Sequence, residues 1–443
     1  MGDFGDFLCP ESVLDLLQYS IEGRQEKKEM NKVHVNVIGL GYIGLPTAMI
    51  MAAHDVRVVG TDVNQELVAT LNSGRMTFRE DGIEELFRQA VEKGITFTTE
   101  YQNAEVYIIS VPTPYDKCTK RIDPTYVVKA VNSVLDVCEK GAILVVESTV
   151  SPGTMDRYVR PAVAEHGFVT GVDIHLVHAP ERIMPGRMIQ ELLHNFRTIG
   201  ADNPAIGEKV RRIYQSFCRG EIEITDIRTA EMTKVVENTY RDINIAFANE
   251  LLKLCRSGGM DANEIIRIAN KHPRVNILMP GPGVGGHCIS VDPWFLVGDY
   301  PELAKMIRLA RETNDGMPGY VLERVSALMK EKGFLDFSRV GFYGLTYKEN
   351  IDDVRESPTL QLMEKMETHM ANPPKTYDPM VATTIVDGQY HDFEAFLKDI
   401  DLMVVMVHHA HLDAELDRVR NKVVFDTRNC NLPWDETVKV FYL

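Results

Sequence analysis

One cysteine stands in a loop whose composition suits covalent catalysis. Cys288 lies within the segment GPGVGGHCISVDPW, and glycines occupy positions 281, 283, 285 and 286 before it. Backbone without side chains can approach a ligand closely, and a helix beginning nearby would stabilise the reactive thiolate. A lone cysteine is nevertheless more often a small buried apolar residue than a nucleophile. The segment alone therefore indicates a candidate nucleophile and leaves both interpretations open.

Polar residues at helical spacing are the next candidates. Asp292 would share a helical face with Cys288, but Asp292-Pro293 also matches an N-cap followed by the proline favoured at the first helical position. Earlier in the chain, three residues at i, i+4 and i+7 line one face of a predicted helix: Lys234, Asn238 and Arg241. The alternative for these three residues is a solvated polar stripe.

A glycine pattern near the start of the chain predicts a dinucleotide site. Gly39, Gly41 and Gly44 follow the apolar run VHVNVI and precede the helical stretch LPTAMIMAA. Such glycines allow a tight turn, close approach of the backbone to a pyrophosphate, and close packing of the helix on the sheet. Asp62 ends the next apolar run, where a carboxylate accepts hydrogen bonds from the ribose hydroxyls and repels a 2′-phosphate. NAD is therefore favoured over NADP; the alternative is an ordinary glycine turn with Asp62 as a helix cap.

The elements that must position these residues alternate between strand and helix patterns. From Lys32 the Val- and Ile-rich runs VHVNVIGL, VRVVGTDV, VYIISV and AILVVES predict βαβ units on a parallel sheet. The strand signal fades between about 225 and 330, where apolar residues at helical spacing predict a long helix that ends at Gly258-Gly259. Alternation resumes after Gly333. The predicted fold class is α/β, with two doubly wound Rossmann-like domains joined by a central helical segment.

Four segments are predicted along the chain. They are an N-terminal extension (1–31), a dinucleotide-binding domain (32–224), a central helical or dimerisation domain that carries the cysteine loop (225–332), and a second sheet domain (333–443).

Bulk composition excludes several classes of protein. The 443 residues carry a formal net charge of -16, which repels nucleic acid and anionic membrane surfaces. The longest apolar run near the C-terminal end, Leu402 to Val407, is too short to cross a bilayer. Seven scattered cysteines without a CxxC pair argue against disulfides or zinc and favour a reducing cytoplasm. We expect no metal at His408, His409 and His411, which lack partner ligands in the sequence and suggest a surface turn.

Long motifs link these pieces to a known family. They are GLGYIGLP, VPTP, ESTVSPGT, APERIMPG, RTAEMTKVVENTYRDINIAFANE, HPRVNI, GPGVGGHCISVDPWF and KENIDDVRESP. From about Val33 to its end, the chain resembles the UDP-glucose/GDP-mannose dehydrogenase family. The stretch HPRVNILMPGPGVGGHC favours the members that oxidise UDP-N-acetyl-D-mannosamine to the uronate, a precursor for polysaccharide biosynthesis. The resemblance implies that the last segment (333–443) binds the UDP-sugar.

The resemblance implies a four-electron oxidation that consumes two NAD molecules. Cys288 would attack the aldehyde formed from the C6 alcohol, and the thiohemiacetal would be oxidised to a thioester that water hydrolyses. Lys234 would serve as acid/base and stabilise the oxyanion, with Asn238 beside it. Glu181 would assist hydrolysis, while Thr149 and Asp292 would hold water and contact the cofactor.

The resemblance also implies two sets of ligand contacts. Cofactor contacts are expected at Gly39, Gly41, Tyr42, Ile43, Gly44, Asp62, Thr113, Thr149 and Arg355. Substrate contacts are expected at Arg182, Ile183, Lys234, Asn238, Arg241, His272, Arg274, Gly285, Tyr347, Lys348 and Arg355. In related enzymes the region of His272 and Arg274 reaches a neighbouring subunit, so a homodimer or a higher homo-oligomer is expected.

Two alternatives stay open from the sequence. A dehydrogenase for UDP-N-acetylglucosamine or UDP-glucose would use the same core chemistry with different pocket contacts. A non-catalytic NAD-binding protein could keep the fold, although Cys288, Lys234, Asn238 and Glu181 together argue against it.

Overall fold

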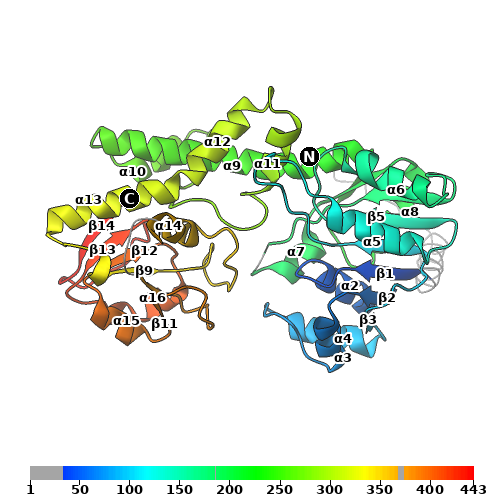
Figure 1. The fold of residues 1–443 in the computed structure, drawn as a ribbon, viewed down its shortest axis with the longest axis horizontal. Helices are drawn as coiled ribbons and strands as arrows, with labels where there is room; N and C mark the ends of the chain where they lie inside the picture. Colours follow the sequence, from blue (N-terminus) through cyan, green and yellow to red (C-terminus); the bar gives the residue numbers. More distant parts are fainter. Residues whose placement is uncertain (1–32, 185, 368–373) are drawn as a thin grey trace, which may run out of the picture. The chain divides into compact units, whose positions relative to one another are not determined.

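The computed structural model describes residues 33–184, 186–367 and 374–443, so the predicted extension 1–31 lies outside the described residues. The described residues divide into two units (Figure 1). The first contains 33–113 and Pro124–Glu231, and the second contains Pro114–Asp123 and Met232–Leu443. The segment Pro114–Asp123 thus leaves the first unit and belongs with the second. The predicted boundaries at 32, 225 and 333 stay predictions.

An eight-stranded sheet forms the centre of the first unit, in the order β3-β2-β1-β4-β5-β6-β7-β8. Its strands are β1 (His34–Ile38), β2 (Arg57–Thr61), β3 (Thr96–Thr98), β4 (Val106–Ile109), β5 (Ala142–Val146), β6 (Ile174–His178), β7 (Arg197–Ala201) and β8 (Ile222–Thr225). Strands β4 and β5 are buried throughout, as expected for Val- and Ile-rich strands covered on both faces.

One pair of strands departs from the predicted parallel arrangement. Strand β7 runs antiparallel to β6, with Val177 opposite Ala201 and His178 opposite Gly200. The amino end of β7 therefore lies at the sheet edge where β1, β4, β5 and β6 have their carboxyl ends. The chain changes direction between β1 and β4, and ligands of open α/β sheets bind at such a switch point.

Helices complete the first unit and enclose its apolar core. They are α2 (Gly44–Ala53), α3 (Gln65–Asn72), α4 (Ile83–Glu92), α5 (Thr125–Leu135), the π-helix η1 (Met155–Val159), α6 (Arg160–Glu165), α7 (Met188–His194) and α8 (Pro204–Gln215). Buried side chains from β1, β2 and β4 form one cluster with α2, α4 and α8.

A long helix, α9 (Ile227–Ser257), begins in the first unit and continues into the second, where Figure 1 draws it in green. It ends just before Gly258-Gly259, as predicted. The helix is apolar on more than one side: Val235 is buried, whereas Val236, Phe247 and Leu254 are exposed.

The second unit adds further helices and a wholly parallel sheet. The helices are α10 (Ala262–Ala269), α11 (Asp292–Asp299), α12 (Lys305–Asp315), α13 (Met317–Lys332), α14 (Pro358–Glu367), α15 (Phe393–Asp399), α16 (Ala410–Ala414) and the 3₁₀ turns η2 (Phe337–Arg339) and η3 (Leu416–Arg418). The six-stranded sheet has the order β11-β10-β9-β12-β13-β14. Its strands are β9 (Val340–Tyr343), β10 (Lys375–Tyr377), β11 (Gln389–Tyr390), β12 (Leu402–Val405), β13 (Val423–Asp426) and β14 (Lys439–Tyr442).

The predicted fold class is confirmed, because two Rossmann-like sheets are connected by a helical segment of the chain. No helix within the described ranges is long and apolar enough to span a membrane.

Candidate functional site

Two of the three glycines in the turn after β1 leave no room for a side chain. Gly39 has φ +89°, and a Cβ there would lie 2.4 Å from the Ser110 carbonyl oxygen. A Cβ on Gly44 would lie 2.0 Å from the Gly39 carbonyl oxygen, whereas one on Gly41 would meet nothing within 4 Å. Helix α2 begins at Gly44, and no side chain caps its first turn. This cradle fits a dinucleotide pyrophosphate.

Asp62 lies directly after β2, beside the same turn. Its Oδ2 accepts a hydrogen bond from the Leu40 amide (2.7 Å), and its Oδ1 accepts one from the Asn64 amide (2.8 Å). Asn64, not Asp62, caps helix α3. The helix-cap alternative for Asp62 is therefore wrong, and the carboxylate is oriented by the turn that would hold the cofactor.

Two predicted cofactor residues follow neighbouring strands at this sheet edge. Thr113 follows β4 and is buried, and Thr149 follows β5 and is half-buried. Between them, Ser148 Oγ accepts the Val111 amide hydrogen bond (2.8 Å) and donates to the Val111 carbonyl (2.6 Å). Ser148 thus ties the two loops together.

Glu80, which the sequence did not single out, connects two predicted contact segments. Its Oε2 accepts hydrogen bonds from the Tyr42 hydroxyl (2.7 Å) and the Gly186 amide (3.0 Å), and its Oε1 accepts one from the Met188 amide (3.1 Å). Glu80 therefore holds the glycine turn's tyrosine and the loop after Glu181 in register.

Glu181 lies in a buried charge cluster. Its carboxylate forms an ion pair with Arg197 at the start of β7, and Arg197 also faces Glu147 at 3.8 Å. Tyr214 donates a hydrogen bond to Glu147 (3.0 Å). Burial and the neighbouring Glu181 charge raise the pKa of Glu147 to about 8. Burial alone would lower the pKa of Arg197, but the carboxylates Glu181 and Glu147 raise it.

Arg182 and Ile183 follow Glu181 on the same loop. The Arg182 guanidinium donates to Thr198 Oγ1 (3.1 Å) and lies over the Phe196 ring (5.4 Å). Ile183 packs against the core of the first unit. Arg182 thus holds the loop against β7, and Ile183 holds it against the core of the first unit.

In the second unit, Lys234 and Asn238 of α9 are buried, so the solvated-stripe alternative is wrong for these two. Arg241 is exposed. Asn238 Nδ2 donates a hydrogen bond to Asp292 Oδ2 over 2.6 Å. Burial raises the pKa of Asp292 to about 6, against the opposing effects of the Lys234 charge and the Asn238 hydrogen bond.

Cys288 lies outside helix α11, which begins four residues later at Asp292. The Cys288 carbonyl accepts hydrogen bonds from the amides of Val291 (3.1 Å) and Asp292 (2.8 Å). Val291 occupies the N-cap position without a side-chain hydrogen bond, so the N-cap alternative for Asp292 is wrong.

The thiol of Cys288 is reachable by solvent, and its pKa is raised to about 11. Burial within the surrounding loop is the main cause, and the Asp292 charge adds to it, while Lys234, Arg355 and Arg241 oppose both. The predicted stabilisation of the thiolate is therefore wrong for the chain by itself, because burial and the Asp292 charge outweigh the nearby cations.

The glycine loop before Cys288 packs against a second loop. A Cβ on Gly285 would lie 2.5 Å from the Tyr347 Cβ, and one on Gly286 would lie 2.8 Å from the Tyr347 ring. The Gly286 amide donates to the Arg355 carbonyl (2.9 Å). Arg428, which sequence reasoning missed, lies 2.8 Å from the position of a Cβ on Gly281.

Arg355 is positioned by a neighbour in its own loop. Its Nε contacts both carboxylate oxygens of Asp353 (2.9 and 3.0 Å), and its Nη2 donates to Asp353 Oδ2 (2.6 Å). Such a fork holds the guanidinium plane in one orientation.

His272 and Arg274 lie on an exposed loop after α10. The Arg274 amide donates to His272 Nδ1 at 3.3 Å. Their predicted role toward a neighbouring subunit stays a prediction.

The expectation of a surface turn is wrong for one of the three clustered histidines. His409 is completely buried, and its Nε2 lies 3.2 Å from Asp378 Oδ2. His408 pairs with Asp413, and His411 contacts the hydroxyls of Tyr343 and Tyr377. No group of three or more potential ligand side chains within the described part of the chain is arranged to hold a metal ion.

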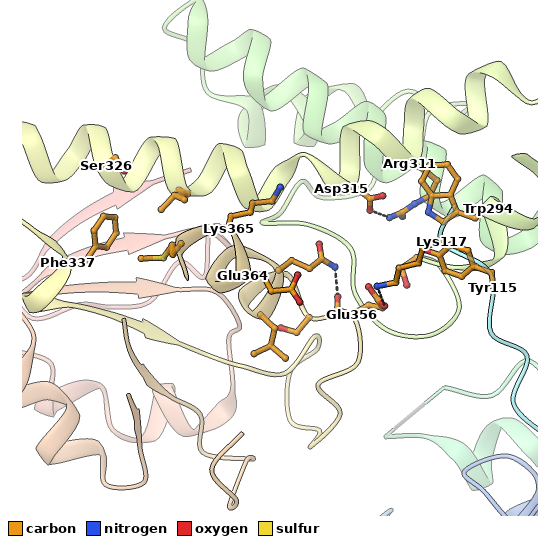
Figure 2. A pocket seen from close by; sticks show the side chains of 16 residues that line it. Tyr115, Lys117, Trp294, Arg311, Asp315, Ser326, Phe337, Glu356, Glu364 and Lys365 are labelled. Atoms are coloured by element: carbon orange, nitrogen blue, oxygen red, sulfur yellow. Dashed lines mark hydrogen bonds and ion pairs between the residues drawn. The ribbon is translucent and has the colours of Figure 1, made fainter. Parts of the chain in front are cut away.

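A pocket of about 1010 Å³ lies in the second unit beside these loops (Figure 2). Ser290 and Trp294 line it together with Tyr115 and Lys117, and Lys117 faces Glu356 at 3.8 Å. No predicted site residue lines this pocket, although Ser290 and Glu356 adjoin Cys288 and Arg355 in sequence.

Models of one protein family match three successive parts of the chain. The UDP-glucose/GDP-mannose dehydrogenase family matches through its NAD binding domain at residues 33–218, its central domain at 228–316 and its UDP binding domain at 341–433.

Individual proteins match over almost the whole chain. A UDP-N-acetyl-D-mannosamine dehydrogenase of Methanococcus vannielii is 40% identical over 418 residues, 92% of this chain and 94% of the relative. An NDP-N-acetyl-D-galactosaminuronic acid dehydrogenase of Ralstonia nicotianae is 40% identical over 406 residues, 89% and 95% of the two chains. The solved UDP-N-acetyl-mannosamine dehydrogenase of Staphylococcus aureus superposes with a TM-score of 0.83 at 40% identity, covering 92% of this chain and 98% of that one.

Proposed function

Since the chain belongs to the UDP-glucose/GDP-mannose dehydrogenase family, we propose that it oxidises the C6 alcohol of UDP-N-acetyl-D-mannosamine to the carboxylate. The chain is an NAD-dependent dehydrogenase with a UDP-binding domain. NAD, when bound, accepts the hydride in each of the two oxidations. The balance is one alcohol, one water and two NAD⁺ giving one carboxylate, two NADH and three protons.

The chemistry of the second unit rests on the cluster of Lys234, Asn238, Asp292 and Cys288. Lys234 takes the proton of the C6 hydroxyl as the aldehyde forms. When the Cys288 sulfur attacks the aldehyde carbon, the developing alkoxide receives its charge stabilisation from the Lys234 ammonium. Asn238 orients the Asp292 carboxylate through its 2.6 Å hydrogen bond.

Hydrolysis releases the product from Cys288. Water adds to the thioester carbon, its proton passes to the Glu181 carboxylate, and the carbon–sulfur electron pair returns to the sulfur. The ion pair with Arg197 supports this role, because it orients the Glu181 carboxylate.

The observation that carries the proposal is the buried cluster beside the Cys288 loop. Lys234, Asn238 and Asp292 are all buried, Asn238 donates a hydrogen bond to Asp292, and the Lys234 charge acts on both Asp292 and Cys288. A nucleophile with a buried cation beside it is what nucleophilic oxidation of an aldehyde requires. A merely structural cysteine would not need a buried lysine beside it.

The substrate assignment is supported by relatives of that name at about 40% identity. The decisive test measures NADH formed per sugar consumed, with UDP-N-acetyl-D-mannosamine, UDP-N-acetyl-D-galactosamine, UDP-N-acetylglucosamine and UDP-glucose in parallel. Two NADH per UDP-N-acetyl-D-mannosamine, at the highest kcat/KM of the four, is expected. A higher kcat/KM with another sugar would show that this other sugar is the substrate. One NADH per sugar contradicts the four-electron mechanism. If none of the four sugars yields NADH, the chain is a non-catalytic NAD-binding protein.

We also propose that the enzyme is a homodimer that packs through α9. Exposed apolar residues recur on that helix at i, i+4, i+11 and i+18, which places them on one face. They are Val236, Tyr240, Phe247 and Leu254, between 46% and 63% exposed. A contiguous apolar stripe of this kind is typical of an interface. His272 and Arg274 would then serve the partner's nucleotide sugar.

The cytoplasm is the compartment that we propose for this reaction. The six cysteines of the described residues are all free thiols, as in a reducing compartment.

A further inference from the structure

We propose that His409 and Asp378 are positioning residues that hold the loop of Tyr347 and Lys348 in its nucleotide-binding conformation. This inference rests on the proposed function, in which that loop contacts the UDP moiety. It gives a role to a histidine that neither the catalytic cluster nor the cofactor cradle uses.

The topology brings the three segments together. The Tyr347 loop follows β9, Asp378 follows β10 and His409 follows β12. Strand β9 lies between β10 and β12, and all three are parallel, so their carboxyl ends meet at one sheet edge. From β9 the chain adds β10 and β11 on one side and then β12, β13 and β14 on the other. The carboxyl ends of β9 and β12 are therefore the switch point of the second sheet.

Asp378 anchors the beginning of the loop. Its Oδ2 accepts hydrogen bonds from the amides of Leu345 (2.6 Å) and Thr346 (3.0 Å), and its Oδ1 accepts one from Met380 (2.7 Å). Burial opposes a charge here, but hydrogen bonds and the His409 ring hold the pKa of Asp378 below its usual value. The carboxylate therefore stays ionised and keeps its acceptor positions.

His409 anchors the end of the loop. Its Nδ1 accepts the Asn350 amide hydrogen bond (2.9 Å), so in the neutral ring the proton is on Nε2, facing Asp378 Oδ2 at 3.2 Å. Asn350 adopts φ +57°, and its Oδ1 accepts the Ala410 amide (2.9 Å). The loop is thus clamped from both ends by one buried histidine–aspartate pair.

The clamp reaches the cysteine loop through Tyr347. This side chain occupies the space that a Cβ on Gly285 or Gly286 would need, two to three residues before Cys288. Loosening the loop is therefore expected to weaken nucleotide binding directly. A smaller effect on Cys288 is expected through the contact of Tyr347 with the cysteine loop.

The test measures UDP and NAD affinity of the full chain by calorimetry. His409→Leu, which cannot make either ring hydrogen bond, is expected to weaken UDP binding about tenfold and to leave NAD affinity within about twofold. His409→Gln, which can both accept and donate, should recover most of the UDP affinity. His411→Leu is the matched control. The His411 ring hydrogen-bonds to the hydroxyls of Tyr343 and Tyr377 and packs against Phe393, so this variant should bind UDP normally.

A second variant distinguishes loss of the clamp from loss of the fold. Asn350→Gly removes the exposed side-chain bond to Ala410 and tolerates the positive φ, so the fold should survive while UDP affinity falls several-fold. Faster amide exchange confined to residues 344–350 should accompany it. Unchanged UDP affinity in both His409→Leu and Asn350→Gly overturns this inference but not the proposed function. If the wild-type chain does not bind UDP, both the proposed function and the inference are overturned.

Discussion

The side-chain amide of Asn238 donates a hydrogen bond over 2.6 Å to the carboxylate of Asp292, joining α9 to the first residue of α11. The two residues are 54 positions apart in sequence. The contact fixes an acid near the Cys288 thiol, whose pKa the same acid helps to raise to about 11. Thiol reactivity is therefore limited first by burial and then by the opposing charges of Asp292 and Lys234.

Removing the Asp292 charge should make Cys288 more reactive. In Asp292→Asn the amide oxygen can still accept from Asn238, but the like charge that raises the thiol pKa is gone. Alkylation by iodoacetamide at about pH 8 should accelerate roughly threefold to tenfold. Asp299→Asn, at the other end of α11, is the control and should react at the wild-type rate. Slower alkylation in Asp292→Asn contradicts the electrostatic account.

Lys234→Met should lose turnover by about a hundredfold or more, because the developing alkoxide loses its cation. The same variant should alkylate more slowly than wild type, since Lys234 lowers the pKa of Cys288. Lys253→Met, also on α9, tests for a general effect of losing a lysine there. A near-normal kcat in Lys234→Met would show that Lys234 has no catalytic role.

Cys288→Ser should block completion of the four-electron oxidation while leaving the fold and NAD affinity intact. The cause is the loss of the sulfur that carries the acyl group. Mass spectrometry of wild-type enzyme quenched during turnover should find the sugar attached at residue 288. Two NADH per sugar at a normal rate from Cys288→Ser is the contradicting result.

The buried acid Glu147 predicts a stability change with pH. Its pKa is raised from 4.5 to about 8 in the folded chain, so the folded state binds this proton more tightly than the unfolded state. The resulting stabilisation is complete below about pH 4.5 and is lost as the pH rises through about 8. Between about pH 6 and pH 9 the melting temperature of Glu147→Gln should therefore fall less than that of wild type. Glu165→Gln, on the exposed surface of α6, is the control, and its melting temperature should change with pH as that of wild type does. If Glu147→Gln also changed like wild type, the pKa of Glu147 would not be raised.

Charge placed on the α9 stripe should dissociate the proposed homodimer. Tyr240→Lys puts an ammonium in the middle of the apolar face, and burying it unpaired would cost several kcal/mol. Light scattering should show a dimer for wild type and a monomer for this variant. Leu335→Lys, at an exposed position on another segment, should remain dimeric. A wild-type monomer at the same concentration contradicts the proposal.

Local sequence patterns were sufficient to predict the fold class and several features of the local structure. The glycine turn at Gly39, the carboxylate at Asp62 and the helix that ends before Gly258 each follow from neighbouring residues. The motifs around Lys234 and Cys288 were likewise contiguous, so the family could be identified from them.

Only the tertiary structure showed how distant residues support this site. Arg197 lies behind Glu181 because β7 runs antiparallel, and a pattern of apolar residues carries no strand direction. His409, predicted on a surface turn, is buried because β12 ends beside β9. This places the imidazole ring against the buried Asp378 carboxylate. Amino-acid order determines turns, helix ends and strand segments through local forces. Sheet topology decides which charges meet, since it joins residues that are tens of positions apart.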